Sequence, residues 1–120
     1  MYPYLFSNNN RMEHLFIMNK GQKLINCMIN GDTAAIKSGL KSNATDLKII
    51  AIIHSIIYHI DSDDVIEKIK ILKDDNNYID LCAFTVGEFA VAGLHLLGIE
   101  RYHGDNPSIQ RLIESKFDFK

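Results

Sequence analysis

The sequence predicts an all-α fold built from antiparallel helix pairs, and three observations support this prediction. Apolar residues, including the many isoleucines, recur at the spacing of one helix face along most of the chain. Residues that cap helices precede these periodic stretches, and only 2 prolines interrupt the 120 residues. The stretch over residues 79–99 carries apolar side chains on nearly every face, as a helix does when other helices surround it. We therefore expect a single domain over residues 1–120 with five to seven helices.

For the first part of the chain, the sequence predicts short segments separated by polar breaks. We expect an extended aromatic segment over residues 1–6 and then a helix whose inner face carries Met12, Leu15 and Phe16. Asn19 and Gly21 predict a break after that helix. The next two helices are predicted from their apolar spacing and their ends: residues 24–29, terminated by Asn30-Gly31, and then a helix that starts at Asp32 and ends at Asn43.

The middle of the chain is rich in isoleucine. Thr45 is expected to cap a helix over residues 46–60, although its β-branched residues also leave a strand open as an alternative. The length of this segment and its lack of turn residues favour the helix. Ser62 is expected to cap an amphipathic helix over residues 63–75, with Asp63 and Asp64 in its first turn as the helix dipole prefers.

The predicted central helix starts at Asn76-Asn77 and runs to Ile99. Its small residues, Ala83, Gly87 and Ala90, would allow a neighbouring backbone to approach closely. A polar loop follows, and Asn106 with Pro107 at the first helical position opens the last helix, which ends near Phe117.

Two parts of the chain repeat one pattern. Residues 45–60 and 62–74 form a nearly all-apolar helix, a tight polar turn and an amphipathic helix, and residues 77–99 and 107–117 repeat that order. The segment 31–40, with the helix before it, is a candidate for a third and shorter pair. This arrangement resembles HEAT-like α-helical repeats, which implies either a short solenoid or an irregular bundle. The resemblance covers most of the chain and rests on the pattern of helices.

Length, composition and charge exclude several classes of protein. A chain of 120 residues buries enough surface to fold without a disulfide or a metal ion. Its hydrophobic fraction of 47% and charged fraction of 23% argue against disorder. The formal net charge of −2 gives no general attraction to nucleic acid or to an anionic membrane. We expect no direct binding of either.

Other features favour a cytoplasmic protein. Cys27 and Cys82 lie in apolar stretches and are expected to be buried free thiols in a reducing compartment, although their spacing does not exclude a disulfide. The N-terminal residues show neither a basic leader nor a clean apolar core, so we expect no secretory signal. Residues 79–99 are long enough to span a bilayer, but Asp80, Glu88 and His95 make that costly.

Few residues form a pattern that indicates catalysis. Glu88 and His95 are seven positions apart, so they share one helix face and are a candidate acid–base pair, with His103 as a third pocket residue. More often such a stripe is a place where a helix reaches solvent or receives a loop, and no nucleophile accompanies it. His54 and His59 are five apart and cannot chelate one metal, and no phosphate-binding loop is present. We expect no enzyme activity, no cofactor and no metal.

The strongest charge feature lies between Asp61 and Asp80. This segment contains seven acidic residues and three lysines, and most of the acids lie near the two ends of one predicted helix. An acidic edge of this kind can steer a basic partner and raise its association rate. The alternative is a solvated helix whose charges complement its dipole. The residues proposed for partner binding are the acids and the neighbouring tyrosines: Asp61, Asp63, Asp64, Asp74, Asp75, Tyr58 and Tyr78.

A small, mildly acidic, all-helical chain of this kind is similar to the immunity proteins that neutralise bacterial toxins, including those of contact-dependent growth inhibition. The resemblance is one of size, charge and architecture, and it carries over no family residues. It implies a bacterial inhibitor that covers the active site or substrate groove of a basic toxin domain, such as a nuclease. Two alternatives stay open: a small helical enzyme or ligand-binding protein with the Glu88/His95 pocket, and a subunit that forms homo-oligomers through the Ile-rich helix.

Overall fold

The computed structural model describes residues 20–79 and 82–117, and within these ranges the chain forms six α-helices, one 3-10 turn and no strand. The prediction of an all-α fold is confirmed. The predicted helix with Met12, Leu15 and Phe16 and the aromatic segment 1–6 lie outside the described residues. The elements are α3 (Lys20–Ile29), α4 (Thr33–Lys41), α5 (Thr45–Ile57), α6 (Asp63–Ile71), η1 (Leu72–Asp74), α7 (Val86–Leu96) and α8 (Pro107–Ser115).

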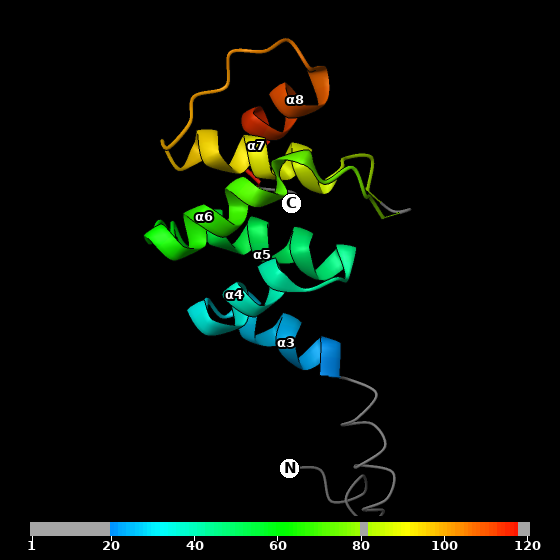
Figure 1. Cartoon of the computed structure of the whole chain (residues 1–120), viewed down its shortest axis with the longest axis vertical. Helices are drawn as coiled ribbons and strands as arrows, with labels where there is room; N and C mark the ends of the chain where they lie inside the picture. The colour runs from blue at the N-terminus through cyan, green and yellow to red at the C-terminus, as the bar shows by residue number, and fades with distance from the viewer. Residues whose placement is uncertain (1–19, 80–81, 118–120) are drawn as a thin grey trace, which may run out of the picture.

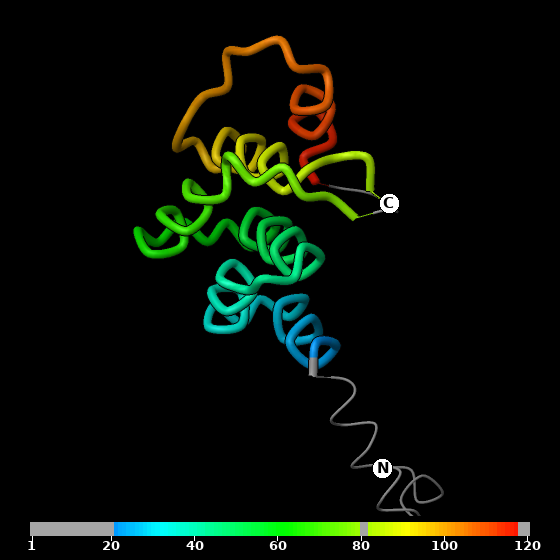
Figure 2. Tube along the Cα trace, turned by 45° about the vertical axis from the view of Figure 1, so that its right-hand side comes forward, coloured from blue at the N-terminus to red at the C-terminus, as the bar shows by residue number. Residues whose placement is uncertain are grey.

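The helices stack roughly in chain order along the long axis of the molecule (Figure 1). α3, α5 and α7 contact one another in succession, while α4 contacts both α5 and α6. α6, η1 and α8 all pack on α7. Figure 2 shows the same order from a second direction, with α3 at one end and α7 with α8 at the other. α5 and α7 therefore have neighbours on several sides, which explains why apolar residues cover most of their circumference.

One continuous core runs through this stack. Its central side chain is Phe89 of α7, which is 2% exposed and meets the rings of Phe84 and Phe117 edge to face, with ring centroids 5.8 and 5.6 Å apart. Such aromatic pairs add stability beyond the area that they bury. The other large, fully buried side chains come from α3 to α8: Met28, Ile36, Ile52, Val65, Ile69, Val86, Leu94 and Leu112.

Several helix ends lie where their capping residues predict them. Asp32 accepts hydrogen bonds from two backbone N–H groups at the start of α4, and Asn106 does the same for α8, with Pro107 at the first helical position. Gly31 has a φ of 82°, the left-handed conformation that a glycine stop provides. The predicted break at Gly21 is wrong, because Gly21 lies inside α3.

The predictions for α5 and α6 need smaller corrections. Ala44 occupies the N-cap of α5, so Thr45 is its first helical residue and not its cap. Ser62 is the N-cap of α6, as expected, although its side chain makes no capping hydrogen bond. α6 ends at Ile71, and η1 continues the chain as a tighter turn.

The largest difference from the prediction concerns the central helix. α7 begins at Val86, so the predicted start at Asn76-Asn77 is wrong. The described residues between η1 and α7, residues 75–79 and 82–85, are not helical, and we call them the connection. The apolar residues of the connection resemble a helix segment in composition, but the connection is not helical, and the carbonyls of its polar residues Asp75 and Asn77 bond to the start of α7.

Candidate functional site

The connection is fixed to the start of α7 by backbone hydrogen bonds. The N–H of Gly87 donates to the carbonyl of Asp75 at 2.8 Å, and the N–H of Val86 donates to the carbonyl of Asn77 at 2.9 Å. The first N–H groups of a helix have no partner within it, so these carbonyls satisfy two of them. A Cβ on Gly87 would lie 2.4 Å from the carbonyl oxygen of Lys73. Glycine is therefore required for η1 to approach α7 this closely.

Glu88 has a structural role at the same helix end. Its Oε1 accepts the Thr85 N–H at 2.9 Å, and the Glu88 N–H donates to Thr85 Oγ1 at 3.1 Å. This reciprocal pair is a capping box. The second oxygen of Glu88, Oε2, accepts from Asn106 Nδ2 at 3.3 Å and so links α7 to the start of α8.

His95 also holds the chain together. Its Nδ1 accepts the backbone N–H of Tyr102 at 2.9 Å, which requires a lone pair on Nδ1 and places the proton of the neutral ring on Nε2. A cavity of about 320 Å³ lies beside it, and the described residues that line it are His95, Gly98 and Arg101. Of the three residues of the alternative pocket, His95 lines this cavity, whereas Glu88 is engaged in the capping box and His103 is exposed.

The predicted partner-binding acids separate into two groups. Asp64 lies 3.0 Å from Lys37 of α4 and also contacts Lys68, and the hydrogen bonds from Lys68 and then Lys37 lower its pKa from 3.8 to about 2. Asp75 lies 2.9 Å from Lys48. Burial opposes its ionisation, but hydrogen bonds from Asn77 and Lys48 outweigh this and lower the pKa of Asp75. Both carboxylates bond within the fold.

The other acids face solvent. Asp63 and Asp74 are exposed, and neither forms an ion pair or a side-chain hydrogen bond with another residue in the described ranges. Glu67, which lies between them on α6, is exposed and unpaired in the same sense. Asp61 is exposed and lies 3.7 Å from His59, a contact that is an ion pair only when the imidazole is protonated.

Asp63, Glu67, Ile71 and Asp74 share one side of α6 and η1, which we call the outer face. Their spacing of four, four and three positions keeps them within about a quarter of the helix circumference. Ile71 is 71% exposed, the largest exposed fraction among the exposed large apolar side chains of the described residues. Val65, Ile66 and Ile69 lie on the opposite, buried side. The sequence reasoning missed Glu67 and Ile71 as candidate binding residues. Ile71 falls outside the apolar stripe of this helix, and this position was a signal that its side chain is exposed.

The two tyrosines differ in their surroundings. Tyr78, in the connection, is 63% exposed. Tyr58 is 46% exposed, but its hydroxyl donates to the carbonyl of Ile29, and its ring lies against Gly31, where a Cβ would be 3.0 Å away. Tyr58 therefore joins the end of α5 to the end of α3, while Tyr78 is the more available of the two.

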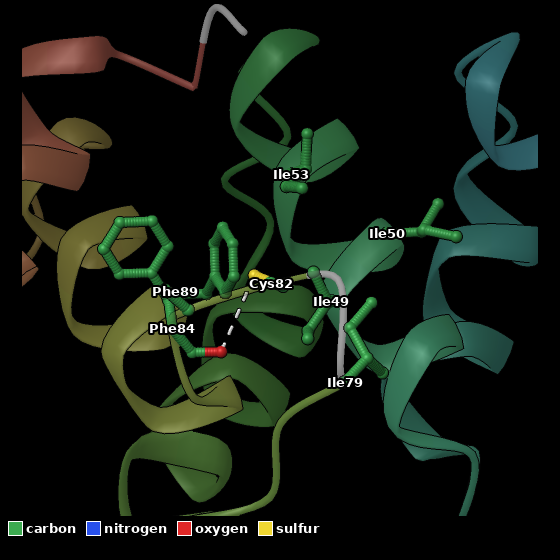
Figure 3. A pocket seen from close by; sticks show the side chains of 8 residues that line it. Ile49, Ile50, Ile53, Ile79, Cys82, Phe84 and Phe89 are labelled. Atoms are coloured by element: carbon green, nitrogen blue, oxygen red, sulfur yellow. Dashed lines mark hydrogen bonds between the residues drawn. The ribbon is translucent and has the colours of Figure 1, made fainter.

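An apolar pocket of about 390 Å³ lies between α5, the connection and the start of α7 (Figure 3). Sequence reasoning missed it, because a helix over residues 79–99 would have placed Ile79 and Phe84 on a different path. Cys82 lies in this pocket as a free thiol, and Cys27 is likewise free and half-buried. The residues lining the pocket are Ile49, Ile50, Ile53, Ile79, Cys82, Ala83, Phe84 and Phe89.

In comparisons with known proteins, no family model, curated protein or solved structure matches this chain. The likeness to HEAT-like repeats and to immunity proteins therefore stays a prediction from pattern. Among the described helices, none combines the length and the apolar character needed to cross a membrane. Within residues 20–79 and 82–117, no three His, Cys, Asp or Glu side chains are grouped to hold a metal ion.

Proposed function

We propose that this chain is a protein-binding inhibitor of the immunity-protein type, which acts in the cytoplasm by covering the active site or substrate groove of a toxin domain. It has no catalytic role of its own in this proposal. One observation carries the proposal: among the described residues, the two most exposed large apolar side chains, Ile71 and Tyr78, lie on one short segment that runs from α6 through η1 into the connection.

Exposed side chains of this size are available to a partner. They contribute little to folding, because solvent contacts them in the folded chain as well as in the unfolded one. Covering an isoleucine or an aromatic ring in an interface stabilises the complex by about 1.5–3 kcal/mol for each side chain. Aromatic side chains that fill pockets of a partner often dominate the energy of an interface.

The segment that carries these two side chains is also held firmly. The hydrogen bonds of Val86 and Gly87 fix the connection to α7, and Lys48 joins α5 to Asp75. A surface that is already ordered loses little conformational entropy when it binds. Such a surface suits an inhibitor that acts by occlusion, because little binding energy is lost in ordering it.

The test is a capture experiment followed by an activity assay. The tagged chain, expressed in the cells that produce it, is expected to bind one protein at a 1:1 ratio. That protein, expressed alone, should be toxic, and the chain should neutralise it. Tyr78→Ala is expected to weaken capture, whereas Ile99→Ser, at an exposed apolar position outside this segment, should not. A chain that captures no protein, or captures one without toxic activity, would contradict the proposal.

One observation favours a second candidate, a homo-oligomeric subunit joined through α5. Ile57, near the end of α5, is 54% exposed, and Ile53 one turn before it is half-buried. Sedimentation of the purified chain over a range of concentrations tests this candidate. A mass that rises with concentration for the wild type but not for Ile57→Ser would favour it, and a constant monomer mass would exclude it.

A further inference from the structure

In the described ranges, no lysine forms an ion pair with the three acids of the outer face. Lys68 pairs with Asp64, while Lys70 and Lys73 lie 3.8 and 2.9 Å from Glu100. Asp64 and Glu100 are not among the four residues of the outer face, although Asp64, seven positions before Ile71, and Lys70, seven positions after Asp63, both border it. Lys70 and Lys73 share one carboxylate, and in the described ranges no ion pair neutralises Asp63, Glu67 or Asp74.

We propose that the outer face, Asp63, Glu67, Ile71 and Asp74, binds a protein whose surface carries lysine or arginine side chains around an apolar depression. This inference rests on the proposed function and specifies where the partner binds and what its surface offers. Lysine and arginine donate charge-assisted hydrogen bonds to carboxylates. The depression receives Ile71, which lies between Glu67 and Asp74 on the face. An apolar side chain within a polar rim is the usual arrangement of an energetic hot spot.

The charge of the outer face selects among classes of macromolecule. Its three carboxylates repel the phosphates of nucleic acid and the head groups of an anionic membrane. In the described part of the chain no group of acidic side chains is arranged to hold a metal ion, so these acids do not form a cation site. A basic protein surface is complementary to the three charges, and its apolar depression is complementary to Ile71.

The outer face is fixed in place by the side of the helix that faces inward. Val65 and Ile69 are 0% exposed, so they hold α6 against the core. The ion pair between Asp64 and Lys37 joins α6 to α4, and the pairs of Lys70 and Lys73 with Glu100 join this segment to the loop after α7. The four outer side chains therefore keep their spacing before the partner arrives, which lowers the entropy lost on binding.

The experiment selects binders from random linear peptides displayed on phage, with the full chain immobilised as target. The face variant carries Asp63→Lys, Glu67→Lys and Asp74→Lys together. The matched control carries Asp46→Lys, Asp105→Lys and Glu114→Lys, three exposed acids on other elements, so that its net charge changes equally. Because charge reversal can disturb a helix, a second variant with Asp63→Asn, Glu67→Gln and Asp74→Asn tests the same face without adding positive charge.

The expected selection is rich in lysine and arginine with at least one large apolar residue. These peptides should bind the face variant at least about tenfold more weakly and keep their affinity for the control. Ile71→Ser should weaken binding by roughly ten- to a hundredfold, the loss expected for one buried isoleucine. Ile57→Ser, at another exposed isoleucine, should change nothing. Selected peptides that lack basic residues, that bind the face variant as well as the wild type, or that fail to appear would overturn the inference.

The outcome can be separated from that of the proposed function. If the chain captures a toxin from its cells and the face variant captures it equally well, this inference fails and the inhibitor function stands. If the peptides require the outer face and no toxin is found in the cells, the basic-partner surface stands and the inhibitor function fails.

Discussion

The two sides of α6 and η1 contain the same kinds of residue and behave differently. On the inner side, Val65 and Ile69 are fully buried, and at the border between the two sides the exposed Asp64 pairs with lysines of α4 and α6. On the outer side, Ile71 is 71% exposed and Asp63 has no ion-pair partner in the described ranges. The difference shows that, of isoleucines and aspartates a few positions apart on one helix, some stabilise the fold and others remain available for binding.

The largest expected difference between the two sides is in the free energy of unfolding. Ile69→Ala removes a side chain that is 0% exposed and should lower this free energy by about 2–5 kcal/mol, because it leaves a cavity in the core. Ile71→Ala should change it by less than about 0.5 kcal/mol. Urea unfolding followed by circular dichroism measures both. Equal losses at the two positions would show that the outer face is packed in solution.

The close approach of η1 to α7 predicts the next largest effect on stability. A glycine-to-alanine change should destabilise the protein at this approach and stabilise it elsewhere in a helix. Gly87→Ala places a Cβ 2.4 Å from the carbonyl oxygen of Lys73, so η1 must move away from α7. This change should lower the free energy of unfolding by about 1–3 kcal/mol. Gly21→Ala in α3 is the control, because among the described residues no atom outside its own helix backbone and chain neighbours lies within 4 Å of its added Cβ. There the alanine should stabilise the helix by up to about 1 kcal/mol. A Gly87→Ala variant that is as stable as the wild type would contradict the described approach.

The capping box at the start of α7 gives a smaller effect. Thr85→Ala removes the hydroxyl that accepts the Glu88 N–H and should cost about 0.5–2 kcal/mol of stability. Thr33→Ala, at an exposed first position of α4, should change stability by less than about 0.5 kcal/mol. Thermal unfolding of the two variants under the same conditions compares them. An equal effect at both positions would mean that the cap is not formed.

Helix ends could be predicted from the sequence where local residues determine them. Asp32, Asn106 and Pro107 were identified because their side chains cap the helix that follows directly. The start of α7 was missed for two reasons. The apolar residues of the connection continue the composition of the helix, and the carbonyls that hold this end belong to residues about ten positions earlier. The spacing of Thr85 and Glu88 was nevertheless a readable capping signal.

The candidate surface could be predicted in part. The acidic character of residues 61–75 and the amphipathic nature of α6 are visible in the sequence. The sequence does not show which carboxylates are unpaired, because pairing depends on contacts between segments that are distant in the chain, such as Asp64 with Lys37 and Asp75 with Lys48. The apolar pocket beside the connection could not be predicted either, because it forms where α5 contacts a segment that the sequence predicts to be helical.

The smallest expected effect is a pH dependence that separates Asp64 from Asp63. The pKa of Asp64 is lowered from 3.8 to about 2 because Lys68 and Lys37 bond to its ionised form. A carboxyl group whose pKa is lower in the folded chain than in the unfolded chain stabilises the fold above the unfolded pKa. The stabilisation from Asp64 is therefore present above about pH 4 and is lost as the pH falls towards about 2.

Comparing each variant with the wild type at several pH values isolates this contribution, because the other carboxyl groups titrate in both proteins. Asp64→Asn should lower the urea midpoint at pH 6, and the difference from wild type should shrink steadily between about pH 4 and pH 2. Asp63→Asn, which removes a carboxylate without an ion-pair partner in the described chain, should show a smaller difference at pH 6. A difference for Asp64→Asn that stays constant with pH would mean that its lysine contacts do not stabilise the fold. The paired Asp64 and the unpaired acids would then be equivalent in solution, and the selection of Asp63, Glu67 and Asp74 as the partner-binding acids would lose its structural basis.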